Sequence, residues 1–229
     1  MTAYLLLVYL LGAVPFGLVV TTLYGNDVDI RRAGSGNIGA TNVGRVFGWR
    51  IAAAVLALDI AKGFFPTLFA WCLFDSGIWW PCVVGLMAFV GHCWPVYLQF
   101  RGGKGVATAA GVLLALAPVP TLGAAAVWGG LLAGTGRSSI AALGATLASM
   151  FLVAWWNPSL ILLVATLGVG ILVRHLTNIG RLVRGEESEI VRPVRWGGRA
   201  RPVSAEEVLA QGPGGGEAVP VWKGQPPTE

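Results

Sequence analysis

The stretch "AYLLLVYLLGAVPFGLVVTTLY", residues 3–24, carries no charged side chain and is apolar along most of its length. At 1.5 Å per residue a helix of this stretch is about 33 Å long, enough for the roughly 30 Å hydrocarbon core of a bilayer. No lysine or arginine precedes it, so the charged start of a signal peptide is missing. The stretch predicts a transmembrane helix, which Pro15 and Gly17 are expected to bend without ending.

The composition of the whole chain agrees with this beginning. Its 229 residues are 55% hydrophobic and 12% charged, and the mean hydropathy is +0.69. A soluble domain carries roughly 25% charged residues, so this composition excludes a soluble globular domain. The protein is expected to be an all-α integral membrane protein.

Six further apolar runs follow, at about 51–73, 79–99, 106–118, 120–135, 139–156 and 159–176. The region 106–135 is too long for one span and short for two, and Pro118 and Pro120 interrupt it. If it forms two short helices, fifteen of the sixteen lysines and arginines lie on one side of the membrane. The positive-inside rule then predicts seven transmembrane helices, with the N-terminus outside and the C-terminus in the cytoplasm. A re-entrant or five-span arrangement is the alternative.

The composition changes near residue 186, where Pro, Gly, Arg and Glu become frequent. This change divides the chain into a transmembrane domain, residues 1–187, and a flexible basic tail in the cytoplasm, residues 188–229. Within the tail, Ser204 can act as the N-cap of a short helix over Ser204–Gln211. Its basic residues can meet anionic lipid headgroups.

One polar segment, "RGGKGVAT" at 101–108, stands directly before an apolar run. Gly102, Gly103 and Gly105 free backbone N–H groups to point at a ligand, and the following helix N-terminus and Lys104 add positive charge. The segment therefore predicts an anion site. It is not a Walker A loop, because glycine follows the lysine where serine or threonine is required. A plain turn with a snorkelling lysine is the alternative.

A second polar segment, "AGSGNIGATNVGR" at 33–45, follows the first apolar run. The spacing of Gly34, Gly36 and Gly39 matches a dinucleotide-binding fingerprint, but that fingerprint must follow a strand and none is visible. Arg45 offers a bidentate fork for phosphate. The uncharged hydrogen-bonding groups come from Ser35, Asn37, Thr41 and Asn42.

Ionisable residues also occur within or beside the apolar runs. Asp59 and Lys62 lie three apart on one helix face and are expected to form an ion pair that supports a site; direct substrate contact and ion transport are the alternatives. His92 and His175 can each be a general base or a hydrogen-bonded structural residue. His175 has the stronger claim, because Asn178 lies on the same helical face.

Together these segments predict a cavity that faces the cytoplasm, with Arg45, Lys104 and Arg181 around it and apolar helices behind. Such a cavity suits one or two phosphorylated substrates, one of them bearing a lipid chain. Neither a G-x-S-x-G elbow nor a cluster of metal ligands occurs in the sequence, so no metal and no cofactor are expected. A transporter for an organic phosphate is the rival interpretation, although no internal repeat is visible.

Four segments resemble the signature segments of bacterial acyl-phosphate:glycerol-3-phosphate acyltransferases: "SGNIGATNVGR", "LDIAKG", "GHCWPVYLQFRGGKGVAT" and "HLTNIGRLVRGEE". The resemblance covers about residues 1–187. It implies an enzyme of the bacterial inner membrane that moves an acyl group from acyl phosphate to the 1-hydroxyl of glycerol 3-phosphate, giving lysophosphatidate and phosphate. The implied partners are these two substrates, membrane lipids and the soluble enzyme that supplies acyl phosphate. Nucleic acid is not among them, and the oligomeric state stays open.

The resemblance also implies roles for particular residues. The expected catalytic residues are Ser35, Arg45, Lys104, His175 and Asn178. The expected substrate-binding residues are Gly34, Gly36, Asn37, Gly39, Thr41, Asn42, Gly102, Gly103, Gly105, Arg181 and Glu187, and Asp59, Lys62 and His92 are expected to support them. Because acyl phosphate is already activated, the hydroxyl can attack it directly, and either His175 or a substrate phosphate oxygen takes the proton. An acyl-enzyme on Ser35 is the less favoured mechanism.

Overall fold

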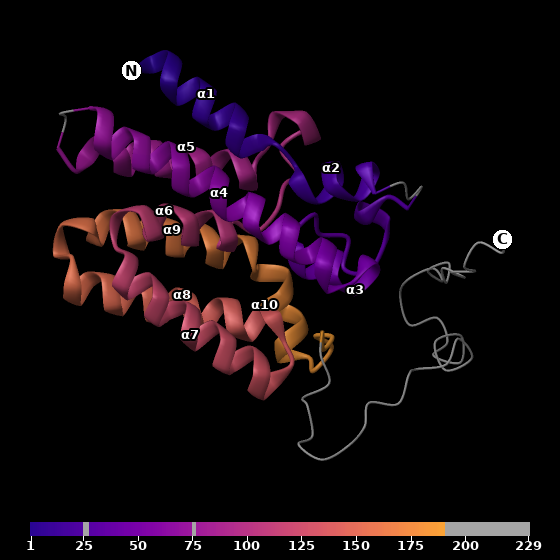
Figure 1. Ribbon diagram of the computed structural model, residues 1–229. Helices are drawn as coiled ribbons and strands as arrows, with labels where there is room; N and C mark the ends of the chain where they lie inside the picture. Colours follow the sequence, from indigo (N-terminus) through magenta and orange to yellow (C-terminus); the bar gives the residue numbers. More distant parts are fainter. Residues whose placement is uncertain (25–27, 75–76, 191–229) are drawn as a thin grey trace, which may run out of the picture.

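The computed structural model describes residues 1–24, 28–74 and 77–190, and its regular elements in these ranges are all helical (Figure 1). The α-helices in these ranges are α1 Thr2–Ala13, α2 Phe16–Leu23, α3 Ala40–Phe47, α4 Trp49–Leu73, α5 Trp79–Cys93, α6 Val106–Leu116, α7 Pro118–Thr135, α8 Ser138–Trp156, α9 Ile161–Arg174 and α10 Leu176–Val183. Three short 3₁₀ turns lie at Ile30–Arg32, Val96–Leu98 and Pro158–Leu160.

The long helices form a bundle (Figure 1). Helix α1 packs on α5, and α7 packs on α8 at the opposite side of the bundle. Helices α4, α6 and α9 lie between these pairs, and α4 packs along α6. The short helices α2, α3 and α10 gather at one end, so the segments with most of the polar motifs meet there (Figure 1).

Three helices are long and apolar enough to cross a membrane: Trp49–Leu73, Trp79–Leu98 and Ser138–Trp156. Two bent pairs, α1 with α2 and α9 with α10, raise this number to as many as five in the described ranges. Helix α6 is apolar but has only 11 residues. The all-α membrane class is therefore confirmed, whereas seven spans and their orientation stay a prediction.

The first apolar run is not one continuous helix, so the expectation that Pro15 only bends it was wrong. Helix α1 ends at Ala13, and the next helix begins at Phe16 at an angle of 51°. Val14 has ψ 119°, because the ring of a following proline disfavours the helical conformation, and Pro15 has no N–H for the helical ladder.

The region 106–135 forms two helices, as the sequence indicated. Helix α6 ends at Leu116 and α7 begins at Pro118, with Ala117 extended between them at φ −145°. Proline at the first position of α7 fits because that position needs no N–H donor.

Close contact between α4 and α6 depends on two glycines. A Cβ on Gly63 would collide with the backbone of Thr108, and one on Gly111 would collide with the backbone of Ile60. Small residues at such positions allow helix backbones to approach closely in membranes. This packing holds the N-terminus of α6 against α4.

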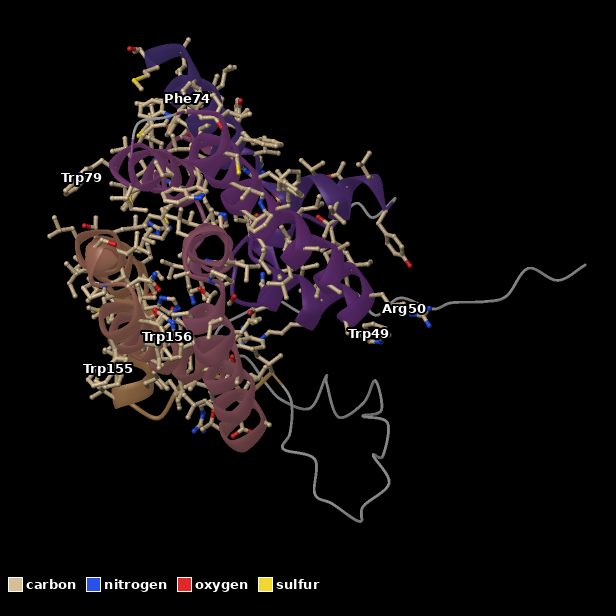
Figure 2. All side chains as sticks on the ribbon, turned by 60° about the vertical axis from the view of Figure 1, so that its left-hand side comes forward. Trp49, Arg50, Phe74, Trp79, Trp155 and Trp156 are labelled. Atoms are coloured by element: carbon tan, nitrogen blue, oxygen red, sulfur yellow. The ribbon has the colours of Figure 1, made fainter. Side chains whose placement is uncertain are left out.

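Aromatic side chains project from the ends of the bundle. In Figure 2, Trp79, Trp155 and Trp156 project on the side away from Trp49 and Arg50. All four tryptophans are exposed, as membrane-interface anchors are.

The predicted tail lies mostly outside the described residues, and so does its predicted helix at Ser204–Gln211. Its first residues contact the helical body. The Ile190 N–H donates to the Gly136 carbonyl at 2.7 Å, and Arg137 lies 3.3 Å from the Glu189 carboxylate. The predicted boundary at residue 188 therefore falls inside a segment that is attached to α8.

Candidate functional site

A cavity of about 390 Å³ lies between α3, α4 and the helices α6 to α10. One end is polar and is lined by Ser35, Asn37, Thr41, Arg45, Lys104, His175, Asn178 and Glu187. The rest is an apolar arm between α6, α7, α8 and α9, lined largely by alanine, leucine and valine. A charged head joined to an apolar arm matches an amphiphilic ligand.

The first wall of the polar end is the polar segment 33–45. It is a loop only as far as Gly39, because α3 begins at Ala40. The Asn42 side chain is buried and holds the loop: its Nδ2 donates to the carbonyls of Ile30 at 3.2 Å and Ala33 at 2.9 Å, and its Oδ1 accepts from the Ser35 N–H at 2.7 Å. Asn42 therefore shapes the wall with bonds to the protein's own backbone.

Glycine is needed at two turns of this loop. Gly34 and Gly36 have φ of 59° and 69°, in the left-handed region that side chains disfavour. Neither residue lines the cavity; they turn the chain so that Ser35 and Asn37 do.

The second wall is the glycine segment around Lys104. The N–H groups of Gly102 and Gly103 donate to the carbonyls of Cys93 at 3.2 Å and His92 at 3.1 Å. The Arg174 guanidinium binds the opposite side of the segment, donating to the Gly102 carbonyl at 2.6 Å and to the Gly103 carbonyl at 2.9 Å. These four bonds fix the segment between α5 and α9. The expectation that the N–H groups of Gly102 and Gly103 point at a ligand was wrong, because both groups are used by carbonyls of α5.

Arg174 was missed as a site residue by the sequence analysis. A signal existed, because the residue directly precedes His175 at the end of an apolar run. The sequence could not show that its partners are backbone carbonyls 71 and 72 residues away.

Lys104 lies at the end of this segment, half-buried in the polar end of the cavity. Burial disfavours the charged ammonium and lowers its pKa to about 8, although the Glu187 carboxylate opposes this and Arg181 adds to it. Gly105 has φ 81° and turns the chain into α6. The N-terminus of α6 therefore lies beside the ammonium, as the sequence indicated.

The third wall combines α10 with the segment after it. The Glu187 carboxylate accepts from Asn178 Nδ2 at 2.7 Å and from Arg181 Nε at 2.7 Å. Burial raises the pKa of Glu187, but these hydrogen bonds outweigh it and hold the pKa below its ordinary value. Arg181 itself does not line the cavity, so it acts here on Glu187.

The predicted helix through His175 and Asn178 is broken at His175. Helix α9 ends at Arg174 and α10 begins at Leu176, at an angle of 58°. The two side chains nevertheless line one cavity, and both are buried. His175 Nδ1 lies 2.8 Å from the Ile171 carbonyl, which can only accept, so Nδ1 carries the hydrogen and Nε2 of the neutral ring is an acceptor.

The expected ion pair between Asp59 and Lys62 is confirmed, with 2.8 Å between Oδ1 and Nζ and both side chains buried. Lys62 also donates to the Val14 carbonyl at 3.0 Å, at the break between α1 and α2. The Asp59 carboxylate lies 3.5 Å from His92 Nδ1, a neighbour that the sequence did not show. A Cβ on Gly103 would collide with the His92 ring, so this buried cluster supports the glycine segment from below.

The cavity therefore brings together most of the candidate residues and leaves others behind it. The candidates that line it are Ser35, Asn37, Gly39, Thr41, Asn42, Arg45, Asp59, His92, Lys104, Gly105, His175, Asn178 and Glu187. Those that do not are Gly34, Gly36, Lys62, Gly102, Gly103 and Arg181.

Four buried polar atoms among the lining residues have no hydrogen-bond partner in the described part of the chain: Nε of Arg45, Oδ1 of Asp59, Nδ1 of His92 and Oδ1 of Asn178. The Asp59 and His92 atoms lie 3.5 Å from each other in the buried cluster, which leaves the Arg45 and Asn178 atoms for a ligand. Leaving such an atom unpaired costs about 1–3 kcal/mol. One is a charged donor and the other is an uncharged acceptor. A ligand with both an anionic group and a hydroxyl would satisfy them.

Comparison with known proteins identifies relatives along nearly the whole described chain. The model of the family described as glycerol-3-phosphate acyltransferase matches residues 2–185. A glycerol-3-phosphate acyltransferase of Syntrophotalea carbinolica is 45% identical over 186 residues, which cover 80% of this chain and 94% of the relative.

Solved structures with the same fold agree. A crystal structure of PlsY (YgiH), an integral membrane glycerol 3-phosphate acyltransferase, in its glycerol 3-phosphate form has a TM-score of 0.77 and 38% identity, and covers 82% of this chain and 94% of that one. The lysophosphatidic acid form has a TM-score of 0.76 at 37% identity, with the same coverage.

Proposed function

The chain belongs to the glycerol-3-phosphate acyltransferase family, and on that premise we propose that it transfers a fatty acyl group from acyl phosphate to the 1-hydroxyl of glycerol 3-phosphate. The protein is an acyltransferase of phospholipid synthesis and an integral membrane protein. The observation that best supports the proposed donor is the shape of the cavity, with a cationic end that opens into a long apolar arm.

The polar end suits two phosphate groups. Lys104 and Arg45 supply two positive charges, and the N-terminus of α6, where Gly105 and Val106 line the cavity, adds backbone N–H groups and the helix dipole. Ser35 and Asn37 add uncharged hydrogen bonds from the opposite wall. Ser35 therefore serves as a binding residue, and no acyl-enzyme is needed.

The chemistry is a single displacement. The 1-hydroxyl oxygen of glycerol 3-phosphate forms the new ester bond to the acyl carbon, and the bond from that carbon to the phosphate oxygen breaks. Phosphate leaves with the electron pair, and the hydroxyl proton passes to a phosphate oxygen of the substrate. Lys104 and Arg45 stabilise the charge that develops, and one preorganised donor of this kind contributes roughly 10²–10³ in rate.

His175 and Asn178 orient the attacking hydroxyl. Nε2 of His175 and Oδ1 of Asn178 are both acceptors, and a hydroxyl has one hydrogen to donate. When the neighbouring 2-hydroxyl of glycerol 3-phosphate donates to either atom, the 1-hydroxyl aims a lone pair at the acyl carbon and keeps its own hydrogen free for the phosphate oxygen. His175 therefore acts through orientation, with the substrate phosphate as the base.

The cavity is proposed to face the cytoplasm of a bacterial cell, in the inner membrane. The distribution of lysine and arginine supports seven spans with the N-terminus outside, counted as α1 with α2, then α4 to α9. Glycerol 3-phosphate then reaches the polar end from water. A soluble enzyme that makes acyl phosphate can deliver its product at the same face.

The test compares donors with purified protein and labelled glycerol 3-phosphate. Palmitoyl phosphate is expected to give lysophosphatidate, and palmitoyl-CoA is expected to give none. Product from palmitoyl-CoA alone would overturn the proposed donor. Uptake of glycerol 3-phosphate into proteoliposomes without any donor, together with no product, would favour the transporter instead.

A further inference from the structure

The apolar arm of the cavity extends away from the polar end along α8. The lining residues of α8 come in order from Ser138 through Ala142 and Ala145 to Ser149. At 1.5 Å per residue, Ser149 lies about 16 Å along the helix from Ser138. The arm is therefore deep enough to receive a chain in a nearly extended form.

Many of the side chains that line the arm are small, beside larger ones such as Leu113, Trp128 and Leu167. Helices α6, α7, α8 and α9 contribute Ala109, Ala110, Ala124, Ala125, Ala142, Ala145 and Gly168. Apart from Ser138 at its polar end, three hydroxyl residues line it, and each donates within its own helix: Thr121 Oγ1 to the Ala117 carbonyl, Thr146 Oγ1 to the Ala142 carbonyl and Ser149 Oγ to the Thr146 carbonyl. The hydroxyls therefore present no unpaired polar atom to an acyl chain.

The arm has a closed floor. One turn beyond Ser149, Val153 is fully buried and does not line the cavity. It belongs to a hydrophobic cluster with Leu113, Ala117, Leu160 and Val164. Close-packed interiors yield little to an extra methylene, so a chain that reaches this cluster must stop there.

We propose that the packed floor of this arm measures the acyl chain, and that Ala142, Ala145 and Ser149 of α8 determine the longest chain the enzyme transfers. The proposal rests on the acyltransferase function proposed above and adds its chain-length specificity. Because the three positions lie at increasing depth, enlarging each of them shortens the accepted chain to a different length. Each methylene that no longer finds an apolar site lowers affinity about fourfold.

The experiment measures kcat/KM for decanoyl, palmitoyl and stearoyl phosphate with Ala142→Leu, Ala145→Leu and Ser149→Leu. Ser149→Leu is expected to lower the palmitoyl value at least tenfold and to leave the decanoyl value within about twofold of wild type. Ala145→Leu is expected to lower the palmitoyl value further and the decanoyl value moderately. Ala142→Leu, nearest the polar end, is expected to lower all three.

Ala126→Leu is the matched control. Ala126 lies on α7 beside lining residues, but it is exposed and does not line the cavity. Its chain-length profile is expected to equal that of wild type.

A further variant lengthens the arm instead of shortening it, so the proposal can be tested even if the leucine variants fail to fold. Val153→Ala removes side-chain volume beneath the floor, so it is expected to raise the ratio of stearoyl to palmitoyl activity at least threefold. The chain-length proposal is overturned if wild type is active and the profiles of Ala145→Leu, Ser149→Leu and Val153→Ala all superimpose on it. Lack of activity with every donor in wild type would instead overturn the proposed function.

Discussion

At the scale of single residues, Lys104 determines how the site responds to pH. Its pKa of about 8 places the loss of its proton within the range where the enzyme can be assayed. The glycerol 3-phosphate dianion binds best to the protonated ammonium, so affinity is high below pH 8 and is lost above it. Between pH 7 and pH 9 the protonated fraction of Lys104 falls about tenfold, and KM for glycerol 3-phosphate is expected to rise by a similar factor.

The control for this prediction is Lys104→Arg. A guanidinium keeps its charge throughout this range, so the KM of the variant is expected to stay flat between pH 7 and pH 9. Steady-state kinetics at fixed acyl phosphate provide the measurement. The same rise in both proteins would show that another group titrates.

Arg174 gives a second prediction at this scale. Its two hydrogen bonds to Gly102 and Gly103 hold the carbonyls of the glycine segment away from the cavity. Arg174→Gln retains at most one of them and is expected to raise KM for glycerol 3-phosphate at least tenfold, with kcat changed less. Arg174→Lys, which keeps the charge and can reach a carbonyl, is expected to recover part of the loss.

Arg184→Gln is the control for Arg174, because Arg184 is exposed and pairs with Glu186 at the surface. It is expected to leave KM and the melting temperature unchanged. A fall in melting temperature for Arg174→Gln with unchanged KM would make Arg174 a purely structural residue.

At the scale of elements, the contact of α4 with α6 positions the anion-binding N-terminus of α6. Gly111→Ala would place a methyl group against the Ile60 backbone and is expected to lower the melting temperature in detergent by several degrees. Overpacking of this kind costs about 1–3 kcal/mol. Gly130→Ala in α7 is the control, because a Cβ there meets nothing within 4 Å. Equal melting temperatures for the two variants would contradict the close-approach argument.

Much at this scale could be predicted from the sequence. Long apolar runs predicted α4 and α8 to within two residues at each end, because hydrophobic length is a local property. The run at 79–99 predicted the start of α5 but extends six residues past its end at Cys93. The break at Pro15 has a local cause, but a proline in a membrane helix can bend the helix or end it, and hydropathy does not distinguish the two. The break at His175 depends on how the helix fits against its neighbours, which hydropathy does not report either. Helix α3 was missed because its glycines and polar side chains hide a short amphipathic helix within a loop-like composition.

The sequence predicted many of the residues that form the candidate site, but it did not predict which hydrogen bonds hold them in place. Motif chemistry predicted a cavity with Arg45, Lys104 and Arg181 around it; the structure places Arg45 and Lys104 in the lining, together with His175, but leaves Arg181 out of it. Motif chemistry did not reveal that Asn42 is used to hold its own loop, or that Arg174 holds the glycine segment. Both facts concern backbone partners that are distant in sequence, and residue types alone do not specify them.

At the scale of the whole molecule, the proposed orientation has a direct test. The test uses a variant without native cysteines. Arg50→Cys places a single thiol at an exposed position at the start of α4, and Ser159→Cys places one at an exposed position just after the end of α8. The two positions lie at opposite ends of the bundle. A membrane-impermeant maleimide is expected to label Ser159→Cys in intact cells, and Arg50→Cys only after permeabilisation. The reverse pattern would place the cavity on the outer side.

The central claim is that one cationic cavity binds the phosphates of both substrates and transfers the acyl group between them. The most direct measurement is lysophosphatidate formation from palmitoyl phosphate and glycerol 3-phosphate by purified wild type and Lys104→Ala. Wild type is expected to form lysophosphatidate and phosphate in equal amounts, and Lys104→Ala to be at least about 10²-fold slower. No product from wild type, or equal rates from both proteins, would contradict the claim.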